Sequence, residues 1–183
     1  MLVTISGTPG SGKTTVARLL ADRLGLPHVY AGDLFRREAT RRGLSLAELN
    51  ELAERDHTID RALDEQLAEY ARRGEVVLEG RLAAFLANRE GVPAWKVWLD
   101  ADEEIRARRV ARREGVDWRE VLEQNRRRQA SDRKRYRDIY GWDLEDTSIY
   151  DLVLDTGAVP PERVAEEILR SIPPDLDGGR TRR

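Results

Sequence analysis

Short apolar runs along the chain alternate with longer segments in which apolar residues recur every three or four positions. Five runs have the length and composition of buried strands, at 2–5, 28–30, 75–81, 95–100 and 149–155. The segments between them place their apolar residues on one face of a helix, as in 16–24 and 160–172. Strands that alternate with helices predict an α/β protein of three layers, in which a five-stranded parallel sheet is covered on both faces.

After the second run, three helices are expected with no strand between them. The first helix is capped by Gly32 or Asp33 and ends near Gly43. The pattern Ser45-Leu46-Ala47-Glu48 is a capping box that starts the second helix. The third helix is expected over 58–73, and its inward face carries Ile59, Leu63, Leu67 and Tyr70. This departure from simple alternation predicts a helical insertion over about 33–73.

Two more helices, at 103–114 and from Asp117 toward Tyr140, are separated by Gly115. A glycine break with polar neighbours lets two helix ends move together, so a mobile lid is expected over about 106–135. The ordered chain is expected to be one domain over 1–172. Residues 173–183 are rich in Pro, Gly and Arg, which predicts a disordered tail.

Composition narrows the class of protein. The 183 residues suffice for one cored domain, and the net charge of −2 suggests no general attraction to nucleic acid. No apolar run is long enough to span a membrane, and no signal-peptide pattern precedes the first strand. A monomer is expected. Cysteine is absent, which excludes a thiolate metal site. His28 and His57 stand isolated in the sequence and are assigned no catalytic role.

The strongest chemical signal is the pattern G-x-x-x-x-G-K-[ST] between the first strand and the first helix. Glycines let successive backbone N–H groups point at phosphate oxygens, and the helix that opens at Lys13 adds its positive end. Lys13 can reach the β- and γ-phosphates of ATP, for which it is a catalytic candidate. The expected ATP-binding residues are Gly7, Thr8, Pro9, Gly10, Ser11, Gly12, Lys13, Thr14 and Thr15.

Two residue types in this region suit Mg²⁺. The Thr14 hydroxyl is in the motif position that binds the ion. Glu79 ends an apolar strand, where an acid organises the Mg²⁺ shell through water in enzymes with such loops. We therefore expect Mg²⁺ as the cofactor and ATP as co-substrate.

Arginine supplies nearly all the positive charge, because only three of the 32 basic residues are lysines. Asp33, Arg36 and Arg81 follow the second and third strands, where a second phosphate-bearing substrate can lie beside the glycine loop. Lid arginines that arrive on closure would stabilise the moving phosphoryl group and exclude water. The catalytic candidates there are Arg109, Arg113, Arg128 and Arg135. The alternative for each arginine is a solvated ion pair.

The chain resembles the nucleoside monophosphate kinases, and among them the short cytidylate kinases of archaeal type. The matching segments cover roughly 2–172: ISGTPGSGKTTVARLLADRLGL, HVYAGDLFR, RRGLSLAELNELAERDHTIDRALD, VVLEGRLA, RRQASDRKRYRDIYGWDLEDTSIYDLVLDT and PERVAEEI. Many enzymes have phosphate loops, whereas the combination of AGDLFR, LEGRLA and IYDLVLDT is more specific.

The resemblance implies a P-loop kinase fold and ATP-dependent phosphorylation of CMP or dCMP with Mg²⁺. It also implies an induced closure and a cytoplasmic location. Carried over by position, Arg36 and Arg81 would hold the acceptor phosphate, and Arg128 and Arg135 would bridge the phosphates. Asp132 would lie near the cytosine, where related enzymes use an Arg-Asp pair. Glu79-Gly80-Arg81-Leu82 departs from the acid-glycine-aromatic-Pro-Arg run of adenylate kinases, which argues against AMP.

Two other functions stay open at this point. A kinase of the same fold could use AMP, UMP or a small metabolite such as shikimate, because base choice depends on a few hydrogen bonds. A nucleotide-sensing module could bind ATP without transferring phosphate. The arginine-rich lid and the helical insertion favour an enzyme with two substrates.

Overall fold

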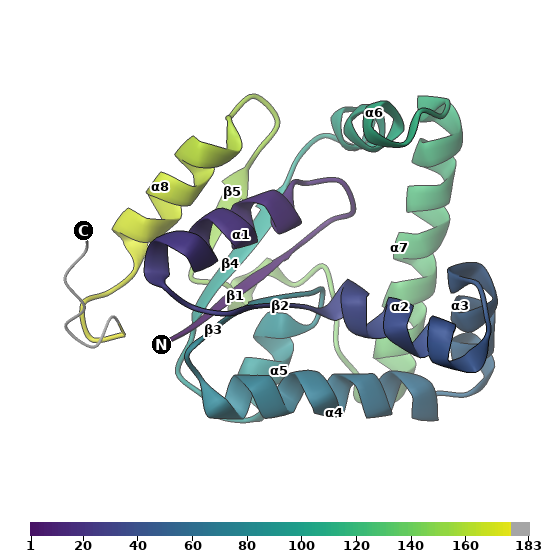
Figure 1. The fold of residues 1–183 in the computed structure, drawn as a ribbon, viewed down its shortest axis with the longest axis horizontal. Coiled ribbons are helices and arrows are strands. Elements are labelled where there is room, and N and C mark those ends of the chain that lie inside the picture. The colour runs from purple at the N-terminus through teal and green to yellow at the C-terminus, as the bar shows by residue number, and fades with distance from the viewer. Residues whose placement is uncertain (177–183) are drawn as a thin grey trace.

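The computed structural model describes residues 1–176, and strands alternate with helices along them (Figure 1). The strands are β1 (Leu2–Gly7), β2 (His28–Tyr30), β3 (Val76–Glu79), β4 (Trp95–Asp100) and β5 (Leu152–Asp155). The first four helices are α1 (Lys13–Leu24), α2 (Ala31–Arg42), α3 (Leu46–Arg55) and α4 (Thr58–Arg73). The others are α5 (Ala83–Arg89), α6 (Glu103–Glu114), α7 (Trp118–Tyr140) and α8 (Pro161–Ser171), with a 3₁₀ turn at Thr147–Ile149.

All strands pair in parallel in one five-stranded sheet, in the order β2-β3-β1-β4-β5, which confirms the predicted fold class. The central strand β1 is buried along its whole length, as its unbroken apolar run predicts. Because the order reverses on either side of β1, the loop after this strand lies at the switch point where α/β proteins bind ligands.

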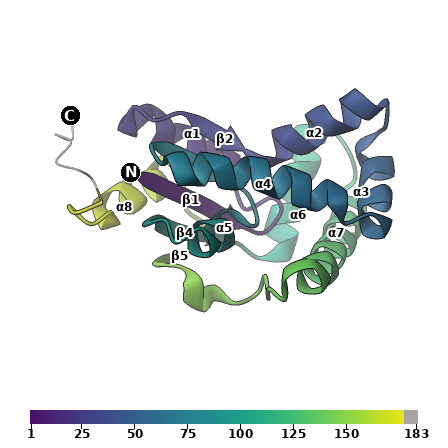
Figure 2. The same ribbon diagram turned by 90° about the horizontal axis from the view of Figure 1, so that it is seen from below.

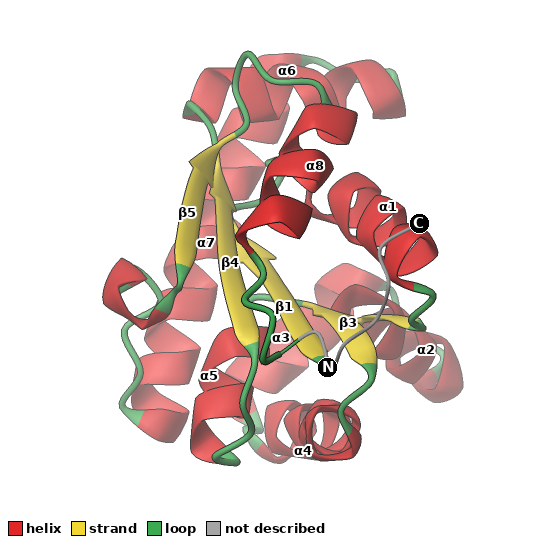
Figure 3. Ribbon diagram, turned by 90° about the vertical axis from the view of Figure 1, so that its left-hand side faces the viewer, coloured by secondary structure: helices red, strands yellow, loops and turns green. Residues whose placement is uncertain are grey.

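Helices cover both faces of the sheet. Helices α1 and α8 pack against each other on one face (Figure 3), and their apolar residues form one core with β1 and β4. Helices α4 and α5 cover the other face and form a second core with β3. No helix among residues 1–176 is long and apolar enough to cross a membrane.

Helices α2 and α3, the first half of α4 and the two helices around Gly115 lie beyond the carboxyl ends of the strands (Figures 1 and 2). Helices α2, α3 and α4 follow one another with no strand between them, as expected, and build a small apolar core around Leu49 and Ile59. Helix α7 runs from α6 down to this insertion, where the Ser131 hydroxyl donates a hydrogen bond to Glu54 of α3. The chain thus builds two helical walls around the strand ends.

Two predicted boundaries differ from the structure. The strand expected over 75–81 covers only Val76–Glu79, because Glu75 has a positive φ of 49° and the chain turns at Gly80 toward α5. The strand expected over 149–155 begins only at Leu152, since 147–149 form a 3₁₀ turn capped by the Asp146 side chain.

Two side-chain predictions in the insertion were wrong. Helix α2 begins at Ala31 and its cap is Tyr30, so neither Gly32 nor Asp33 caps it. Tyr70 is 37% exposed, because the buried stripe of α4 continues from Leu67 to Ala71 instead.

The predicted disordered tail is also revised at its start. The chain makes a turn after Pro173, and Leu176 packs against the core beneath α8. The remainder of that prediction, residues 177–183, lies outside the described residues.

Candidate active site

The loop from Gly7 to Thr15 joins β1 to α1 and has a backbone that only glycine fits at two points. Gly7 has a φ of 146°, and a Cβ there would overlap the carbonyl oxygen of Leu99 on β4. Gly10 has a φ of 80°, and a Cβ there would lie 2.7 Å from the Arg106 carbonyl oxygen. Helix α1 has no acidic residue in its first turn and no side-chain cap at Gly12. Its N-terminal N–H groups are therefore suited to an anion.

Lys13 is held inside this loop, where its charge is disfavoured. Its Nζ donates to the Thr8 carbonyl oxygen at 2.5 Å, and the Thr8 hydroxyl donates to Asp100 at 2.5 Å. Burial, followed by the positive charge of Arg81, lowers the pKa of Lys13 to about 7, although Glu79 acts in the opposite sense. An arriving polyphosphate would supply the negative charge that the protein provides only in part.

Glu79 lies beside the loop with its carboxylate only 1% exposed. The Thr14 hydroxyl donates to Glu79 Oε1 at 2.7 Å, and His28 Nε2 lies 2.9 Å from Glu79 Oε2. A hydroxyl and a carboxylate are hard oxygen ligands that suit Mg²⁺. Residues 1–176 contain no group of three or more His, Asp and Glu side chains that could hold a metal. The donor set fits an ion that takes most of its ligands from phosphate and water.

Arg81, which follows β3, is joined to α7 by a chain of ion pairs. Its guanidinium pairs with Asp132, whose other oxygen accepts from Arg135 Nη2 at 2.9 Å. Arg135 Nε in turn lies 3.5 Å from Asp60 of α4. Burial, followed by the charge of Arg128, lowers the pKa of Arg81 to about 9. The positive charges of the arginines in this cluster are only partly offset by neighbouring carboxylates. Such a cluster suits a site that binds a second anion.

The residues expected after β2 form a separate, open surface. Asp33 and Arg36 pair with each other and are about half exposed, and the Arg36 guanidinium lies 5.0 Å from the centre of the Tyr30 ring. With Arg37, Thr40 and Arg41 they line a hollow of about 580 Å³ on α2. Burial lowers the pKa of Arg81, whereas Tyr30 acts to raise it, so this surface borders the Arg81 site through the Tyr30 ring.

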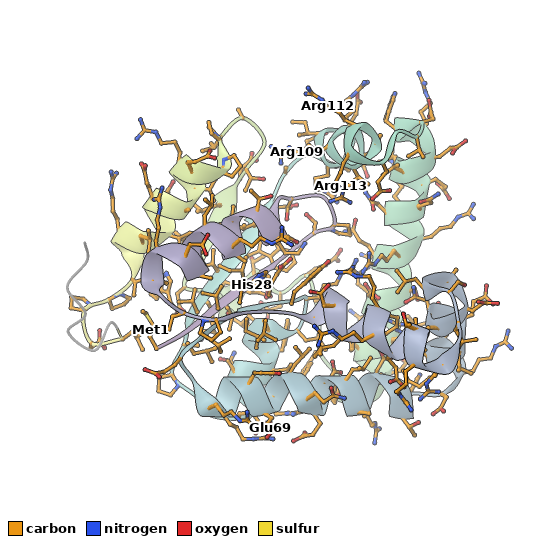
Figure 4. The ribbon with its side chains drawn as sticks, in the orientation of Figure 1. Met1, His28, Glu69, Arg109, Arg112 and Arg113 are labelled. Atoms are coloured by element: carbon orange, nitrogen blue, oxygen red, sulfur yellow. The ribbon has the colours of Figure 1, made fainter. Side chains whose placement is uncertain are left out.

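The four lid candidates have different environments. Arg109 donates to the Thr156 hydroxyl at 3.1 Å and to the Thr156 carbonyl oxygen at 2.5 Å. Arg113 pairs with Glu114 and is 71% exposed. Arg128 is exposed, yet its charge acts on both Lys13 and Arg81. Figure 4 shows Arg109 and Arg113 on α6. Arg135 lies on α7 and is buried.

A family model described as cytidylate kinase-like matches residues 2–158. The chain belongs to the cytidylate kinase-like family. It is 45% identical over 184 residues to a cytidylate kinase of Methanopyrus kandleri, covering 97% of this chain and 95% of the relative. It is 46% identical over 173 residues to a cytidylate kinase of Halobacterium salinarum, covering 94% and 89%. These relatives confirm the resemblance stated from the motifs.

The fold of this family member also occurs in kinases of other substrates. A crystal structure of a gluconokinase from Sinorhizobium meliloti 1021 superimposes with a TM-score of 0.60 at 19% identity, covering 92% of this chain and 89% of that one. This likeness bears on the fold alone. The fold therefore does not identify the acceptor substrate, which depends on the residues at the strand ends.

Sequence reasoning missed several partners in this site. Arg106 is 6% exposed and donates to the Pro9 carbonyl oxygen at 3.0 Å, and this hydrogen bond stabilises the glycine loop. Thr156, after β5, donates to the Ser11 carbonyl oxygen at 2.8 Å. His28 was interpreted as isolated, which is wrong because it contacts Glu79. Only the helical spacing of Arg106 hinted at an inward position, whereas the other contacts join segments far apart in the sequence.

Proposed function

We propose that this protein phosphorylates CMP and dCMP, transferring the γ-phosphoryl group of ATP to give the nucleoside diphosphate and ADP. One observation carries the proposal: Arg81, which follows β3, lowers the pKa of Lys13 in the glycine loop, and Arg128 lowers the pKa of both residues. Two phosphate-binding groups that face one space suit a donor and an acceptor. The cytidylate kinase relatives support cytosine as the acceptor base.

On the donor side, we propose that Gly7–Thr15 bind the phosphates of ATP. Backbone N–H groups of this loop and the start of α1 would hold the β- and γ-phosphates, and Lys13 would donate to their oxygens. Lys13 now donates to the loop's own Thr8 carbonyl oxygen, and a phosphate oxygen would be the better acceptor.

Mg²⁺ fits the same site through Thr14 directly and Glu79 through water. When bound, the ion would supply positive charge that offsets the negative charge developing on the phosphoryl group during transfer. Because Glu79 accepts the Thr14 proton, the lone pairs of that hydroxyl are free to face the ion.

On the acceptor side, we propose that Arg81 and Arg135 bind the phosphate of CMP, with Asp33, Arg36 and Asp132 contributing to the rest of the pocket. Asp132 forms ion pairs with both Arg81 and Arg135 in this structure. An entering phosphate would compete with that carboxylate for the same donors. No protein base is needed, since a phosphate oxygen is already a nucleophile.

Closure would complete the site. We propose a single kinase domain in which 33–73 bind the acceptor and 106–135 form the lid, bringing Arg109, Arg113 and Arg128 to the phosphates. Gly115, with a φ of 71°, ends α6 and separates it from α7, so the lid has a natural hinge. Exclusion of water by the closed lid would favour transfer over ATP hydrolysis.

We propose that the enzyme acts as a cytoplasmic monomer.

A coupled assay of ADP formation tests the proposed acceptor. The full chain with Mg·ATP is supplied in turn with CMP, dCMP, UMP, AMP, GMP, gluconate and shikimate. We expect kcat/KM to be highest for CMP or dCMP. A preference for AMP or a small metabolite would identify a different kinase, and slow ADP formation unaffected by any acceptor would indicate a nucleotide-sensing module.

A further inference from the structure

His28 lies next to the proposed magnesium site, where its ring contacts the Glu79 carboxylate. It belongs to β2, the edge strand, whose Tyr30 pairs with Glu79 of β3 in parallel register. Figure 4 shows His28 near the middle of the molecule, at the central sheet. Its side chain is 16% exposed, so the contact with Glu79 is shielded from water.

Both oxygens of the Glu79 carboxylate have partners. Oε1 accepts from the Thr14 hydroxyl at 2.7 Å, and Oε2 lies 2.9 Å from His28 Nε2. An ionised carboxylate only accepts hydrogen bonds, so Nε2 carries the proton in this contact. A buried carboxylate oxygen that has no hydrogen-bond donor would strongly destabilise the folded protein. His28 therefore stabilises Glu79 in the orientation that receives the Thr14 proton.

His28 would influence the metal through two hydrogen bonds, one from His28 to Glu79 and one from Thr14 to Glu79. With its proton directed at Glu79, Thr14 presents its lone pairs away from that carboxylate, toward the loop's ligand. If the carboxylate turned, the hydroxyl proton would turn with it and could face the cation. Groups that orient metal ligands in this way influence metal affinity although they touch no metal.

We infer that His28 is a positioning residue for Mg²⁺: it fixes the Glu79 carboxylate, which orients the Thr14 hydroxyl. The inference rests on the proposed binding of Mg·ATP and is independent of which acceptor the enzyme uses. This role also accounts for the position of His28, which takes no direct part in the proposed phosphoryl transfer.

The test compares His28→Met with His28→Gln in the full chain. The two side chains have similar length, but only glutamine keeps an N–H donor for Glu79. Calorimetry measures binding of a non-hydrolysable ATP analogue in EDTA and then the Mg²⁺ concentration that half-saturates the complex. His57→Leu, which changes the other histidine, is the matched control.

We expect His28→Met to raise the half-saturating Mg²⁺ concentration about 10-fold while affinity for the analogue in EDTA stays unchanged. His28→Gln should restore most of the difference, and His57→Leu should match the wild type. If His28→Met does not fold, His28→Asn replaces it, because its shorter amide stops short of Glu79.

Two results would overturn the inference. One is a wild-type Mg²⁺ dependence in His28→Met. The other is a merely structural effect, in which the melting temperature and analogue affinity in EDTA fall together and glutamine does not rescue Mg²⁺ binding. Loss of the proposed function is separable, since an enzyme that ignores CMP can still show the Mg²⁺ shift.

Discussion

Lys13 is the residue whose environment departs most clearly from that of an ordinary lysine. Its pKa is lowered to about 7, first by burial and then by Arg81, so near neutral pH a large share of it is uncharged before substrate binds. A bound polyphosphate supplies opposite charge and returns the pKa toward its usual range. ATP binding should therefore take up a proton at this side chain.

This coupling can be measured by calorimetry at pH 8 in two buffers with different ionisation enthalpies. Most Lys13 is neutral there in the free protein, so we expect ATP to take up close to one proton, about 0.9, per site. Lys13→Met should abolish the uptake. The same apparent enthalpy in both buffers for the wild type would contradict the lowered pKa.

Arg81 should matter to the acceptor more than to ATP. Arg81→Ala removes charge-assisted hydrogen bonds to the acceptor phosphate, so we expect KM for CMP to rise about 100-fold, equivalent to about 2.7 kcal/mol. The affinity for Mg·ATP should change little. Steady-state kinetics and calorimetry separate the two.

The matched control for this prediction is Arg127→Ala. Arg127 lies on the exposed side of α7 and pairs only with Glu123 among the described residues, so its loss should leave both constants near wild type. Unchanged acceptor kinetics in Arg81→Ala would remove Arg81 from the acceptor site.

Helices α4 and α7 meet through two buried carboxylates and two tyrosines. Tyr140 donates to Asp64 at 3.0 Å, and one turn earlier Tyr136 donates to Asp60 at 3.4 Å. The pKa of Asp64 is raised to about 7, mainly by burial and also by the charge of Asp60, while Tyr140, Arg89 and Arg135 act in the opposite sense. This contact joins the insertion to the helix that carries Arg135.

The raised pKa predicts how stability changes with pH. Because Asp64 binds its proton more tightly in the folded than in the unfolded chain, its contribution is present at low pH and is lost as pH rises from about 4 to about 7. Between pH 5 and pH 8 the wild type should lose on the order of 2 kcal/mol relative to Asp64→Asn. Urea unfolding at both pH values measures the difference, and parallel pH profiles for the two proteins would contradict it.

Elements were predictable where local chemistry decides them. The capping box at Ser45 forms with both of its hydrogen bonds, and the helix breaks predicted at Gly43 and Gly115 both have left-handed conformation. The last strand was predicted too long, because Asp146 can cap a turn just before it and periodicity does not register such caps.

The site was predictable only in part, for a physical reason. The glycine loop is one continuous segment, so its residues are fixed by their own sequence. The contacts of Glu79 with His28, of Arg81 with Asp132 and of Arg106 with Pro9 join residues about 50 to 100 positions apart. Spacing along the chain cannot reveal which of many arginines turns inward.

At the scale of the whole molecule, the fold gathers these distant segments at one end of the sheet. The donor loop follows the central strand β1, Arg81 follows its neighbour β3, and α7 crosses from α6 to the insertion beside both (Figure 1). Helical walls on either side of the strand ends suit an enzyme that must hold two phosphate-bearing substrates and exclude water. The most direct test of this function is whether the γ-phosphoryl group passes from ATP to CMP.

Product analysis by ion-exchange chromatography provides that test. Wild-type protein and Lys13→Ala are incubated with Mg·ATP and CMP, and the melting temperatures of both are recorded. We expect the wild type to form CDP and ADP in equal amounts, and Lys13→Ala to form neither while retaining its fold. ADP without CDP, or near-normal turnover in folded Lys13→Ala, would contradict phosphoryl transfer to CMP at this loop.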